Sequence, residues 1–424
     1  MIAPSRRSIT LGIMLVVIAL AAADAFLAAQ RFLPAIRAPF LPAPADITET
    51  IPRTGEESAT TTPPDFPLHL PPGFTISIFA KDLPGARVMA LDQFRNIWVS
   101  QTSEGIISLL EIADGRVRSQ STVFRNLRKP HGLAFDPVRP GLLYIAEEHR
   151  VIRRMMTPSD DPGEDVLALP SGEGHFTRTI AFGPDGGLYI SIGSSCNVCN
   201  ETDERRATIL RYDPETGRSE PFARGLRNAV FFAWDAAGRM WATEMGRDWL
   251  GDDTPPDEIN RIGGPSTGSG QSSTPNFGWP NCYGKNIHDT DFDKNTYVRN
   301  PCMEPFERGS FLDIPAHSAP LGLAFIPEIW PAEYRGDLLV AYHGSWNRST
   351  PTGYKVVRYK IGDQGTVSSE QDLLTGFLVP SSVEGLAADG ALGRPVDLLF
   401  QTDGSLLLSD DKAGAIYRIA PPKS

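Results

Sequence analysis

One short pattern recurs six times along this chain of 424 residues, and it constrains the fold more than any other feature. Each copy has a polar or cationic residue, a short apolar stretch, a turn that often contains Asp-Gly, and a second stretch rich in β-forming residues. This arrangement is typical of two paired strands. The copies begin at Arg87, His131, Arg178, Arg227, Leu321 and Arg394.

The spacing of the copies predicts a β-propeller. The first four begin 44, 47 and 49 residues apart, which is the length of one propeller blade. Units of this kind cannot bury their faces alone, and radial stacking buries them while leaving only short edges. We therefore predict an all-β, six-bladed β-propeller over residues 73–424, with residues 248–316 as a long loop insertion after the fourth repeat. Two stacked β-sandwiches would not repeat one pattern along the whole chain.

The first 72 residues differ from the rest. The pair Arg6-Arg7 precedes an apolar stretch that ends at Ala23 and is followed by further small residues. Residues 1–30 are therefore predicted to be a signal peptide, or a membrane anchor if the stretch is retained. Residues 31–72 are rich in Pro, Thr and acidic residues and are predicted to be a linker. In either case the main body is expected in the periplasm or elsewhere outside the cytoplasm.

The four cysteines form an even set in a chain that is predicted to be exported. Two disulfides are therefore expected, Cys196–Cys199 and Cys282–Cys302. The short loop from Cys196 to Cys199 is followed by Asn200, where covalent haem attachment would require His. A four-cysteine zinc site would need two close pairs, and only one pair is close. A redox-active Cys-x-x-Cys pair remains an open alternative.

The formal net charge of −11 argues against a general nucleic-acid binder, which needs a basic face. Nevertheless, cationic residues gather at the starts of the repeats. In a propeller these positions converge at one mouth of the central channel, where like charges repel unless an anion lies between them. Carboxylates across the channel could neutralise them instead. The converging residues are Arg87, His131, His175, Arg178, Arg227, Asn228, His317 and Arg394, and the candidate carboxylates are Glu147, Glu148, Glu244, Asp248 and Asp257.

His175 differs from the other histidines in its surroundings. It stands just before an inner strand and follows Gly172 and Gly174, where small residues allow a ligand to come close. An imidazole that titrates near neutral pH is a suitable base for a hydroxyl proton. His288 instead lies among aspartates, including Asp289, that could bind calcium but lack the full loop pattern.

Several short motifs follow one another in register with the six repeats. They are His175 to Gly186, Gly225-Leu226-Arg227-Asn228, Thr243-Glu244-Met245-Gly246, Asp257-Glu258-Ile259-Asn260, Asn276-Phe277-Gly278-Trp279-Pro280, His343-Gly344-Ser345-Trp346-Asn347-Arg348, and Arg394 ahead of Asp403-Gly404. Each motif is weak alone. Their order over roughly residues 70–420 resembles the quinoprotein sugar dehydrogenases, calcium-dependent six-bladed propellers that carry pyrroloquinoline quinone (PQQ), and most closely the sorbosone dehydrogenase branch.

The resemblance implies catalytic roles for four residues. His175 would be the general base that takes the proton of the sugar's anomeric hydroxyl while hydride passes to the quinone, and Asp257 would orient the imidazole ring. Arg227 and Asn228 would hydrogen-bond the quinone oxygens and stabilise the charge that develops there. A non-catalytic scaffold has no need to assemble these four residues.

The resemblance also implies a calcium site and leaves the sugar site open. Main-chain carbonyls of Gly246 and Arg247 would hold Ca²⁺, which polarises the reacting carbonyl. Related glucose dehydrogenases have Pro where Arg247 stands, so the geometry of the ion can differ here. Candidates for the wall that faces the sugar are His317, Tyr342 and Trp346, each of which could equally be a packing residue of the fifth blade.

PQQ is a tricarboxylate, which agrees with the anion that the cationic mouth requires. Arg394 would bind one of its carboxylates, and Arg87 belongs to the same mouth. A lysine that contacts the cofactor in related enzymes aligns with Gly344 in this chain. Arg348 and Lys355 are the candidates to replace it.

The leading hypothesis is an exported oxidoreductase that uses PQQ and Ca²⁺ to oxidise an aldose or a sorbosone-like aldehyde. Electrons would pass to a separate acceptor, and no nucleic-acid partner is expected. One alternative is a calcium-dependent propeller hydrolase, such as a lactonase. Another is a non-catalytic propeller that binds carbohydrate or protein.

Overall fold

The computed structural model describes residues 62–156, 162–263, 274–304, 307–362, 365–379 and 390–422, which all belong to the unit formed by residues 60–424. The predicted signal or anchor, residues 1–30, lies outside the described residues, as does most of the predicted linker, residues 31–72. Both assignments remain predictions. Among the described residues, no helix has the length and apolar character needed to cross a bilayer.

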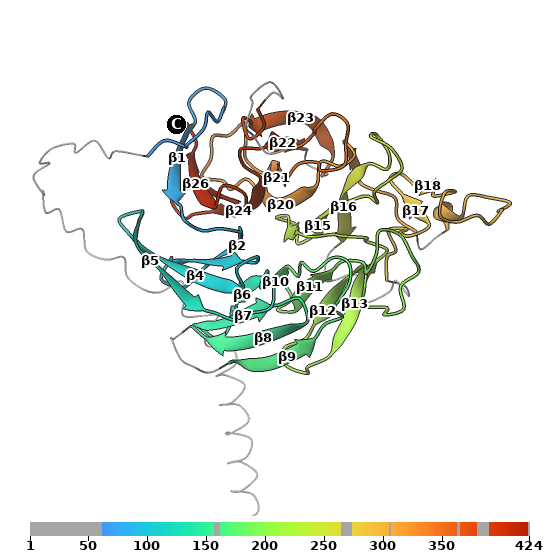
Figure 1. The fold of residues 1–424 in the computed structure, drawn as a ribbon, viewed down its shortest axis with the longest axis horizontal. Coiled ribbons are helices and arrows are strands. Elements are labelled where there is room, and N and C mark those ends of the chain that lie inside the picture. Colours follow the sequence, from blue (N-terminus) through green and yellow to red (C-terminus); the bar gives the residue numbers. More distant parts are fainter. Residues whose placement is uncertain are drawn as a thin grey trace, which may run out of the picture. The chain divides into compact units, whose positions relative to one another are not determined.

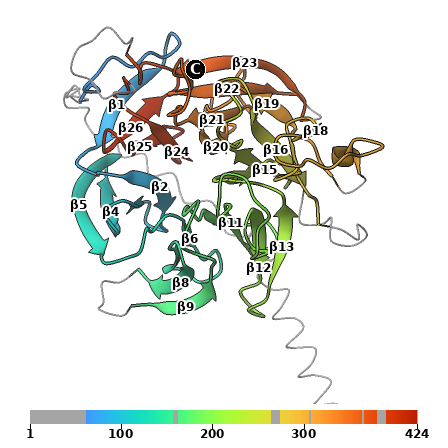
Figure 2. The ribbon, with the colours of Figure 1, turned by 45° about the vertical axis from the view of Figure 1, so that its right-hand side comes forward.

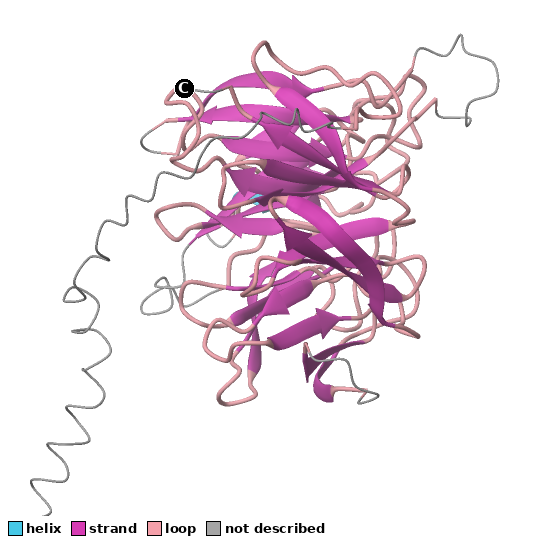
Figure 3. Ribbon diagram, turned by 90° about the vertical axis from the view of Figure 1, so that its left-hand side faces the viewer, coloured by secondary structure: helices cyan, strands magenta, loops and turns pink. Residues whose placement is uncertain are grey.

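Six four-stranded antiparallel sheets are arranged around a central axis as the blades of a propeller, as predicted (Figure 1). Strands dominate every blade, and loops join them at both ends (Figure 3). In blade order the strands are β2 (Ala86–Leu91), β3 (Ile97–Gln101), β4 (Ile106–Ala113) and β5 (Arg116–Phe124); β6 (Leu133–Phe135), β7 (Leu142–Ala146), β8 (Arg150–Met155) and β9 (Glu164–Ala168); β10 (Ile180–Phe182), β11 (Leu188–Ile192), β12 (Thr208–Tyr212) and β13 (Ser219–Arg224); β14 (Phe232–Trp234), β15 (Met240–Glu244), β16 (Asp257–Gly263) and β19 (Leu312–Ile314); β20 (Pro320–Phe325), β21 (Leu338–Tyr342), β22 (Lys355–Ile361) and β23 (Val367–Leu374); β24 (Pro395–Phe400), β25 (Leu406–Asp410), β26 (Ala415–Ala420) and β1 (Thr75–Ala80).

The first strand of each blade lies innermost. In Figures 1 and 2, β2, β6, β20 and β24 turn toward the middle, whereas β5, β9, β13 and β23 lie at the outside. Contacts of β2 with β24 and β6, of β6 with β10, and of β20 with β14 and β24 link neighbouring inner strands. The residues that open the six repeats therefore stand in or just before the inner strands.

The sixth blade is completed by the most N-terminal strand. β1 pairs antiparallel with β26, in the register Thr75↔Ala420, so the two ends of the propeller close the ring. Sequence analysis did not identify this strand, because it has no partner in the repeated pattern. Residues before β1 also contact the propeller: Phe66 packs edge to face on Phe377 and Tyr417.

The segment of residues 248–316 is only partly the long loop that the sequence predicts. Its ends supply β16 and β19, the two outer strands of the fourth blade, which pair in the register Asp257↔Ile314. Between them lie a short hairpin of β17 (Cys282–Tyr283) and β18 (Ile287–His288) and the 3₁₀ helix η2 (Pro301–Met303). The insertion therefore separates the third and fourth strands of that blade.

Two kinds of polar contact stabilise the apolar blades. Asp92 Oδ2 accepts a hydrogen bond from Trp98 Nε1 at 3.1 Å, and Asp235 Oδ2 accepts from Trp241 Nε1 at 2.9 Å, with the same six-residue spacing. Both tryptophans are fully buried, so their N–H groups need a partner inside the protein. In addition, the Thr243 hydroxyl of β15 donates at 2.8 Å to a carbonyl of the next blade, which joins the inner and second strands of neighbouring blades.

Candidate active site

A cavity of about 220 Å³ lies where the segments before β10, β14 and β20 approach one another. It is formed by residues from the third, fourth and fifth blades. The predicted residues that line it are His175, Arg227, Asn228, Gly246, Asp248, Asp257, His317 and Trp346, and it is completed by Met245, Ala319 and Asn347. Residues predicted from widely separated repeats therefore meet at one place.

A larger cavity, of about 430 Å³, lies near the turns of the second and third blades. Its two arginines are already paired, Arg139 with Asp136 at 2.8 Å and Arg211 with Asp185 at 2.7 Å. The smaller cavity holds the predicted chemistry, so we take it as the candidate site.

Close approach of two segments positions His175 beside Asn228. The main-chain N–H of His175 donates to the Ser194 carbonyl at 2.9 Å. A Cβ atom on Gly193 would lie 2.6 Å from both the Cβ of His175 and the Oδ1 of Asn228. Glycine is therefore required at this position, because any side chain would push the two apart.

The hydrogen bonds of His175 determine which ring nitrogen carries the proton. Its Nδ1 lies 3.0 Å from Ser194 Oγ and 3.1 Å from Ser194 O. The Ser194 carbonyl can only accept, and the Ser194 hydroxyl donates its single proton to the Cys196 carbonyl at 2.6 Å, so both oxygens accept from the ring. Nδ1 is therefore protonated and Nε2 keeps its lone pair. Burial, followed by the positive charge of Arg227, lowers the pKa of His175 to about 3, so the ring is a neutral base at neutral pH.

Asp257 does not make the orienting contact that the resemblance implies. Its Oδ1 accepts from the Gly246 amide at 2.9 Å and its Oδ2 from the Ala319 amide at 2.8 Å. The carboxylate thus ties two loops of the cavity together, while Ser194 orients His175. Burial raises the pKa of Asp257 to about 6, and the two amide hydrogen bonds act against that rise.

Arg227 is buried and all three of its nitrogens have partners. Nη1 donates to the carbonyls of Met245 and Gly246 at 3.2 and 2.9 Å. Nε and Nη2 donate to the main-chain and side-chain oxygens of Asn197, both at 2.9 Å, and Nη2 also reaches Asp248 at 3.1 Å. Burial lowers the pKa of Arg227, and the nearby carboxylates partly restore it.

A buried carboxyl supports the neighbouring Asn228. Glu244 Oε1 accepts from the Asn228 amide at 3.0 Å, whereas its Oε2 is buried without a hydrogen-bond partner among the described residues. Burial, together with the charge of Glu258, raises the pKa of Glu244 well above its usual value. Burial likewise raises the pKa of Glu258 to about 7. These carboxyls lie behind the cavity and carry protons more readily than exposed ones.

The remaining predicted arginines belong to a second group of residues, Arg87, His343, Arg394 and Asp411, which we call the Asp411 group. Asp411 is bound by Arg87 at 2.5 Å and by His343 Nε2 at 2.9 Å. Arg394 Nη1 lies 3.3 Å from His343 Nδ1 and donates to the Gly344 carbonyl at 3.0 Å. Burial raises the pKa of Asp411, but its cationic neighbours more than reverse this.

The predicted ring of cations is therefore divided into two. We call His175, Arg227, Asn228, Asp248 and Asp257 the His175 group. Within the described residues, this group lines the cavity and the Asp411 group does not. Of the other candidate carboxylates, Glu148 pairs with Arg128 and Lys129, and Glu147 pairs with Arg150.

Among the described residues, two further predicted site residues, Tyr342 and Arg348, are not part of the cavity lining. Tyr342 cannot form part of a sugar wall, because it is fully buried in the core and its hydroxyl bonds to that of Tyr359. The guanidinium of Arg348 pairs with the Asp253 carboxylate at 2.6 Å and donates to the main-chain carbonyl of Asp252 at 2.7 Å. It does not line the cavity within the described part of the chain.

The predicted calcium ligands fit a hard cation only in part. Main-chain carbonyls and carboxylates are the donors that Ca²⁺ prefers, and the Gly246 carbonyl lies at the cavity. That oxygen accepts from Arg227, so an ion bound there would have to replace a guanidinium proton. The side chain of Arg247 points elsewhere and binds Asp289 and Asp291 at 2.6 and 2.9 Å.

The acidic group around His288 is engaged by protein partners. Asp293 accepts from His288 Nε2 at 3.0 Å and from the Tyr297 hydroxyl at 2.8 Å. Asp289 and Asp291 bind Arg247, so all three aspartates of the group, Asp289, Asp291 and Asp293, already have protein partners. The suggestion of a calcium site at this position receives no support from the geometry.

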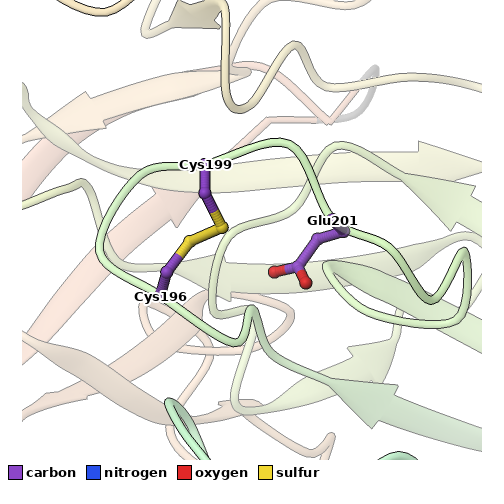
Figure 4. Close-up of side chains that lie close together, drawn as sticks. All are labelled: Cys196, Cys199 and Glu201. Carbon is purple, nitrogen blue, oxygen red and sulfur yellow. A yellow bond between two sulfur atoms is a disulfide. The ribbon is translucent and has the colours of Figure 1, made fainter.

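Both predicted disulfides are present, Cys196–Cys199 and Cys282–Cys302. Figure 4 shows the first one beside Glu201, whose carboxylate accepts from the amide and the hydroxyl of Ser195 at 2.6 and 2.7 Å. Because the two sulfur atoms are bonded to each other and Glu201 is engaged, these three residues do not form a metal site. Sequence analysis missed Ser194 and Asn197, although a Cys-x-x-Cys loop directly after a second strand was an available signal.

Comparisons with known proteins give a family match over most of the chain. Residues 68–421 match the family model described as TrAA12-like. A protein of Borreliella burgdorferi, named only as uncharacterized, is 30% identical over 371 residues, which cover 83% of this chain and 90% of that protein. A pyrroloquinoline quinone-dependent pyranose dehydrogenase of Coprinopsis cinerea is 24% identical over 414 residues, covering 84% of this chain. The match covers 55% of that enzyme, so the chain spans about half its length.

Solved structures share the fold. The PQQ domain of pyranose dehydrogenase from Coprinopsis cinerea, in its holo form, has a TM-score of 0.71 at 21% identity, covering 85% of this chain and 98% of that one. A calcium structure of the family AA12 protein from Trichoderma reesei has a TM-score of 0.70 at 22% identity, covering 84% and 98%. The PQQ-bound aldose sugar dehydrogenase of Streptomyces coelicolor has a TM-score of 0.56 at 18% identity, covering 83% and 100%.

Proposed function

Because the chain belongs to the TrAA12-like family, we propose that it is an oxidoreductase that uses PQQ and Ca²⁺ to oxidise a sugar. One observation carries the proposal: a single cavity is lined by a neutral imidazole, His175, and by the two donors Arg227 and Asn228. A base and electrophilic donors around one small volume are what proton removal from a hydroxyl requires. The relatives named for PQQ and for sugar oxidation give the cofactor and the substrate class.

Two side chains at the cavity are proposed to bind the cofactor. Arg227 and Asn228 would donate to its quinone oxygens, and Arg227 offers the planar donor arrangement that binds carboxyl and carbonyl oxygens well. PQQ, when bound, supplies the two-electron acceptor of the reaction. Arg394 and Arg87 are proposed to contact a cofactor carboxylate, which requires that they loosen their contacts with Gly344 and Asp411.

His175 is proposed as the catalytic base. Its Nε2 has the lone pair, and its protonated Nδ1 is fixed on Ser194, so a sugar hydroxyl can transfer its proton only to Nε2. The field of Arg227 is one cause of the low pKa of His175. An anion beside Arg227 would offset that field and raise the pKa of His175 toward neutrality, where a base is most effective.

Ca²⁺ is proposed to bind the carbonyls of Gly246 and Arg247. Arg227 now donates to the Gly246 oxygen, and it would have to release that oxygen in favour of the ion. Binding of the cofactor would assist this exchange, since it gives Arg227 a negatively charged partner. The proposal therefore predicts that Ca²⁺ and PQQ bind together more tightly than either binds alone.

The sugar is proposed to lie against Trp346, with His317 and Asn347 beside it. Trp346 lines the cavity and is 66% exposed, so it can offer an apolar ring to a sugar. His317 Nε2 is tied to the Gly251 carbonyl at 2.8 Å, which fixes its ring at the cavity wall. An aldose or a sorbosone-like aldehyde is the proposed substrate, with electrons passing to a separate acceptor.

Export to the periplasm or another extracytoplasmic compartment is part of the proposal. The two disulfides support it, since such bonds persist in oxidising compartments. The hydrolase alternative would need free carboxylate ligands for a metal at the cavity. Asp248 and Asp257, the carboxylates that line it, already accept from Arg227, Asn347 and main-chain amides.

Reconstitution tests the proposal. Purified protein treated with a chelator is mixed with PQQ and Ca²⁺, and the quinone absorbance and the reduction of a dye are followed with a panel of aldoses. We expect sugar-dependent dye reduction that requires both additions. No spectral change at micromolar PQQ, with the protein shown to be folded, would refute the assignment.

A further inference from the structure

The loop closed by the Cys196–Cys199 disulfide contacts both functional side chains of the cavity. Asn197, inside the loop, presents its main-chain oxygen to Arg227 Nε and its side-chain Oδ1 to Arg227 Nη2, both at 2.9 Å. Cys196 presents its carbonyl to the Ser194 hydroxyl at 2.6 Å, and Ser194 in turn holds His175. Arg227 and His175 therefore take their orientation from one short loop.

A second set of contacts joins this loop to the fourth blade. Asn197 Oδ1 also accepts from the Asp248 amide at 2.8 Å, and Asn197 Nδ2 donates to the Asp248 carbonyl at 3.1 Å. The side-chain amide of Asn197 thus bonds to both main-chain polar groups of Asp248, and these two hydrogen bonds join a loop of the third blade to a loop of the fourth. The side chain of Asn197 is thus a bridge that neither Ala nor a larger residue could replace, because both its oxygen and its nitrogen are used.

From these contacts we propose that Asn197 and the Cys196–Cys199 disulfide are positioning elements of the site: the disulfide holds the loop so that Asn197 fixes Arg227 and the Cys196 carbonyl fixes the tautomer of His175. The proposal extends the proposed function and rests on it for its effect on turnover. It also replaces the idea of a redox-active Cys-x-x-Cys pair with a structural role for the same bond.

The second disulfide provides a matched comparison. The two cysteines of Cys282–Cys302 are twenty positions apart in the sequence, whereas those of Cys196–Cys199 are three positions apart. A longer loop restricts the unfolded chain more, so the Cys282–Cys302 bond is expected to contribute more to global stability. The Cys282–Cys302 bond lies in the insertion. Among the described residues, neither of these two cysteines makes a hydrogen bond to Arg227 or His175. Local positioning and global stabilisation are thus separated between the two bonds.

The central test compares two double variants of the full chain, Cys196→Ser/Cys199→Ser and Cys282→Ser/Cys302→Ser, each loaded with PQQ and Ca²⁺. For the first we expect kcat to fall about 10- to 100-fold, with the melting temperature close to that of the wild type, because misplacing reacting groups by about 1 Å costs that much. For the second we expect a lower melting temperature and a kcat within about twofold of the wild type below its transition. If kcat falls equally in both variants, or survives in the first, the positioning role is wrong.

A point variant keeps the test independent of the cysteines. Asn197→Ala should lower kcat by about tenfold and leave KM for the sugar nearly unchanged, since one hydrogen bond to a charged group is lost. Asn197→Asp keeps the acceptor for Arg227 but loses the Nδ2 donor to the Asp248 carbonyl, so it should recover only part of that loss. If Asn197→Ala leaves kcat unchanged, Asn197 does not position Arg227 and the proposal is overturned.

One measurement does not depend on the enzyme activity. In cofactor-free protein labelled with ¹⁵N-histidine, the ring of His175, assigned by difference with His175→Gln, should show a protonated Nδ1 and an unprotonated Nε2. Cys196→Ser/Cys199→Ser should shift this ring toward a mixture of tautomers, and Cys282→Ser/Cys302→Ser should not. A single unchanged tautomer in both variants would overturn the proposal even if PQQ-dependent turnover is found. Conversely, a tautomer shift without any turnover would retain the positioning role and refute only the proposed function.

Discussion

The His175 group and the Asp411 group differ in how their positive charge is balanced. Arg227, in the first group, donates mainly to uncharged oxygens of Asn197, Met245 and Gly246. In the second group, the carboxylate of Asp411 is shared by Arg87 and His343. Arg227 therefore divides its donors between several uncharged oxygens and one carboxylate, Asp248, beside a cavity, whereas in the other group a single carboxylate is the shared acceptor.

This difference indicates where an anion would bind. An anion that enters the Asp411 group must compete with a carboxylate that both Arg87 and His343 contact. An anion that meets Arg227 competes with uncharged main-chain and amide oxygens and with one carboxylate, Asp248, whose side chain is about as exposed as that of Asp411, 20% against 17%. The sequence suggests one ring of cations around one guest. We therefore propose the His175 group as the primary contact and the Asp411 group as a secondary one.

The largest expected effect separates the two histidines of these groups. His175→Ala should lower kcat by about 10²- to 10⁴-fold, because proton removal loses its base, while PQQ binding stays nearly intact. His343→Gln, which can still donate to Asp411, should retain more than about a tenth of wild-type kcat. Steady-state dye reduction and a PQQ titration of both variants measure these values.

Equal losses in the two variants would remove the distinction between the groups. Unchanged turnover in His175→Ala would show that another residue is the base. In that case His317, the other histidine at the cavity, would be the next to examine.

The next effect concerns the arginines. Arg227→Lys should weaken PQQ binding by about 10- to 100-fold, since a planar donor with two usable bonds is replaced by a point charge. Arg394→Lys should weaken it by less than about tenfold, because Arg394 already binds His343 and the Gly344 carbonyl. The dissociation constants come from the change in quinone absorbance on titration. A greater loss in Arg394→Lys would make the Asp411 group the main anion site and reverse the comparison.

Much of the fold could be predicted from the sequence, because the repeated pattern marks the inner and second strands of every blade. Inner strands such as β10 and second strands such as β11 fall where the pattern places them. The pattern also places residues such as His175 and Arg227 before inner strands, and these meet at the cavity. β1 could not be found in this way, since it belongs to a blade whose other strands lie at the far end of the chain.

The partners of the site residues were harder to predict. Asn197 contacts Arg227 across thirty residues and lies in a loop with no periodicity, so its role depends on tertiary structure alone. Asp411 directly follows β25, where the second strand of a blade ends. Glu147 likewise follows β7, and Glu244 is the last residue of β15, so the ends of second strands were a usable signal for carboxylates near the mouth. For Tyr342 the prediction named a site residue where there is none. It lies in a second strand, and its aromatic ring packs into the core instead of facing a sugar.

A smaller effect concerns acid stability and again compares the two histidines. Burial is the main cause that lowers the pKa of both His175, to about 3, and His343. Below pH 6.5 the unfolded chain therefore binds more protons than the folded chain, and stability falls as the pH is lowered from 6.5 toward 3. His175→Gln should reduce the loss of unfolding free energy between pH 7 and pH 4.5 by about 2–3 kcal/mol, and His343→Gln by less. Urea unfolding at the two pH values measures this, and an identical loss in all three proteins would contradict the burial of these rings as neutral groups.

The smallest effect concerns two exposed tryptophans at the edge of the cavity. Trp346 and Trp249 are 66% and 72% exposed and pack edge to face, with ring centroids 5.5 Å apart. Only Trp346 is among the residues that line the cavity, and Asn347 Nδ2 fixes its loop by donating to Asp248 at 2.6 Å. Trp346→Ala should therefore raise KM for the sugar by about five- to tenfold with kcat little changed, which corresponds to the loss of one aromatic contact of about 1 kcal/mol. Trp249→Ala should raise KM by less than about twofold, through the support that its ring gives to Trp346. Equal increases in the two variants would mean that the sugar extends past Trp346 onto Trp249, and the binding region would then include the loop that follows Asp248 as well as the cavity.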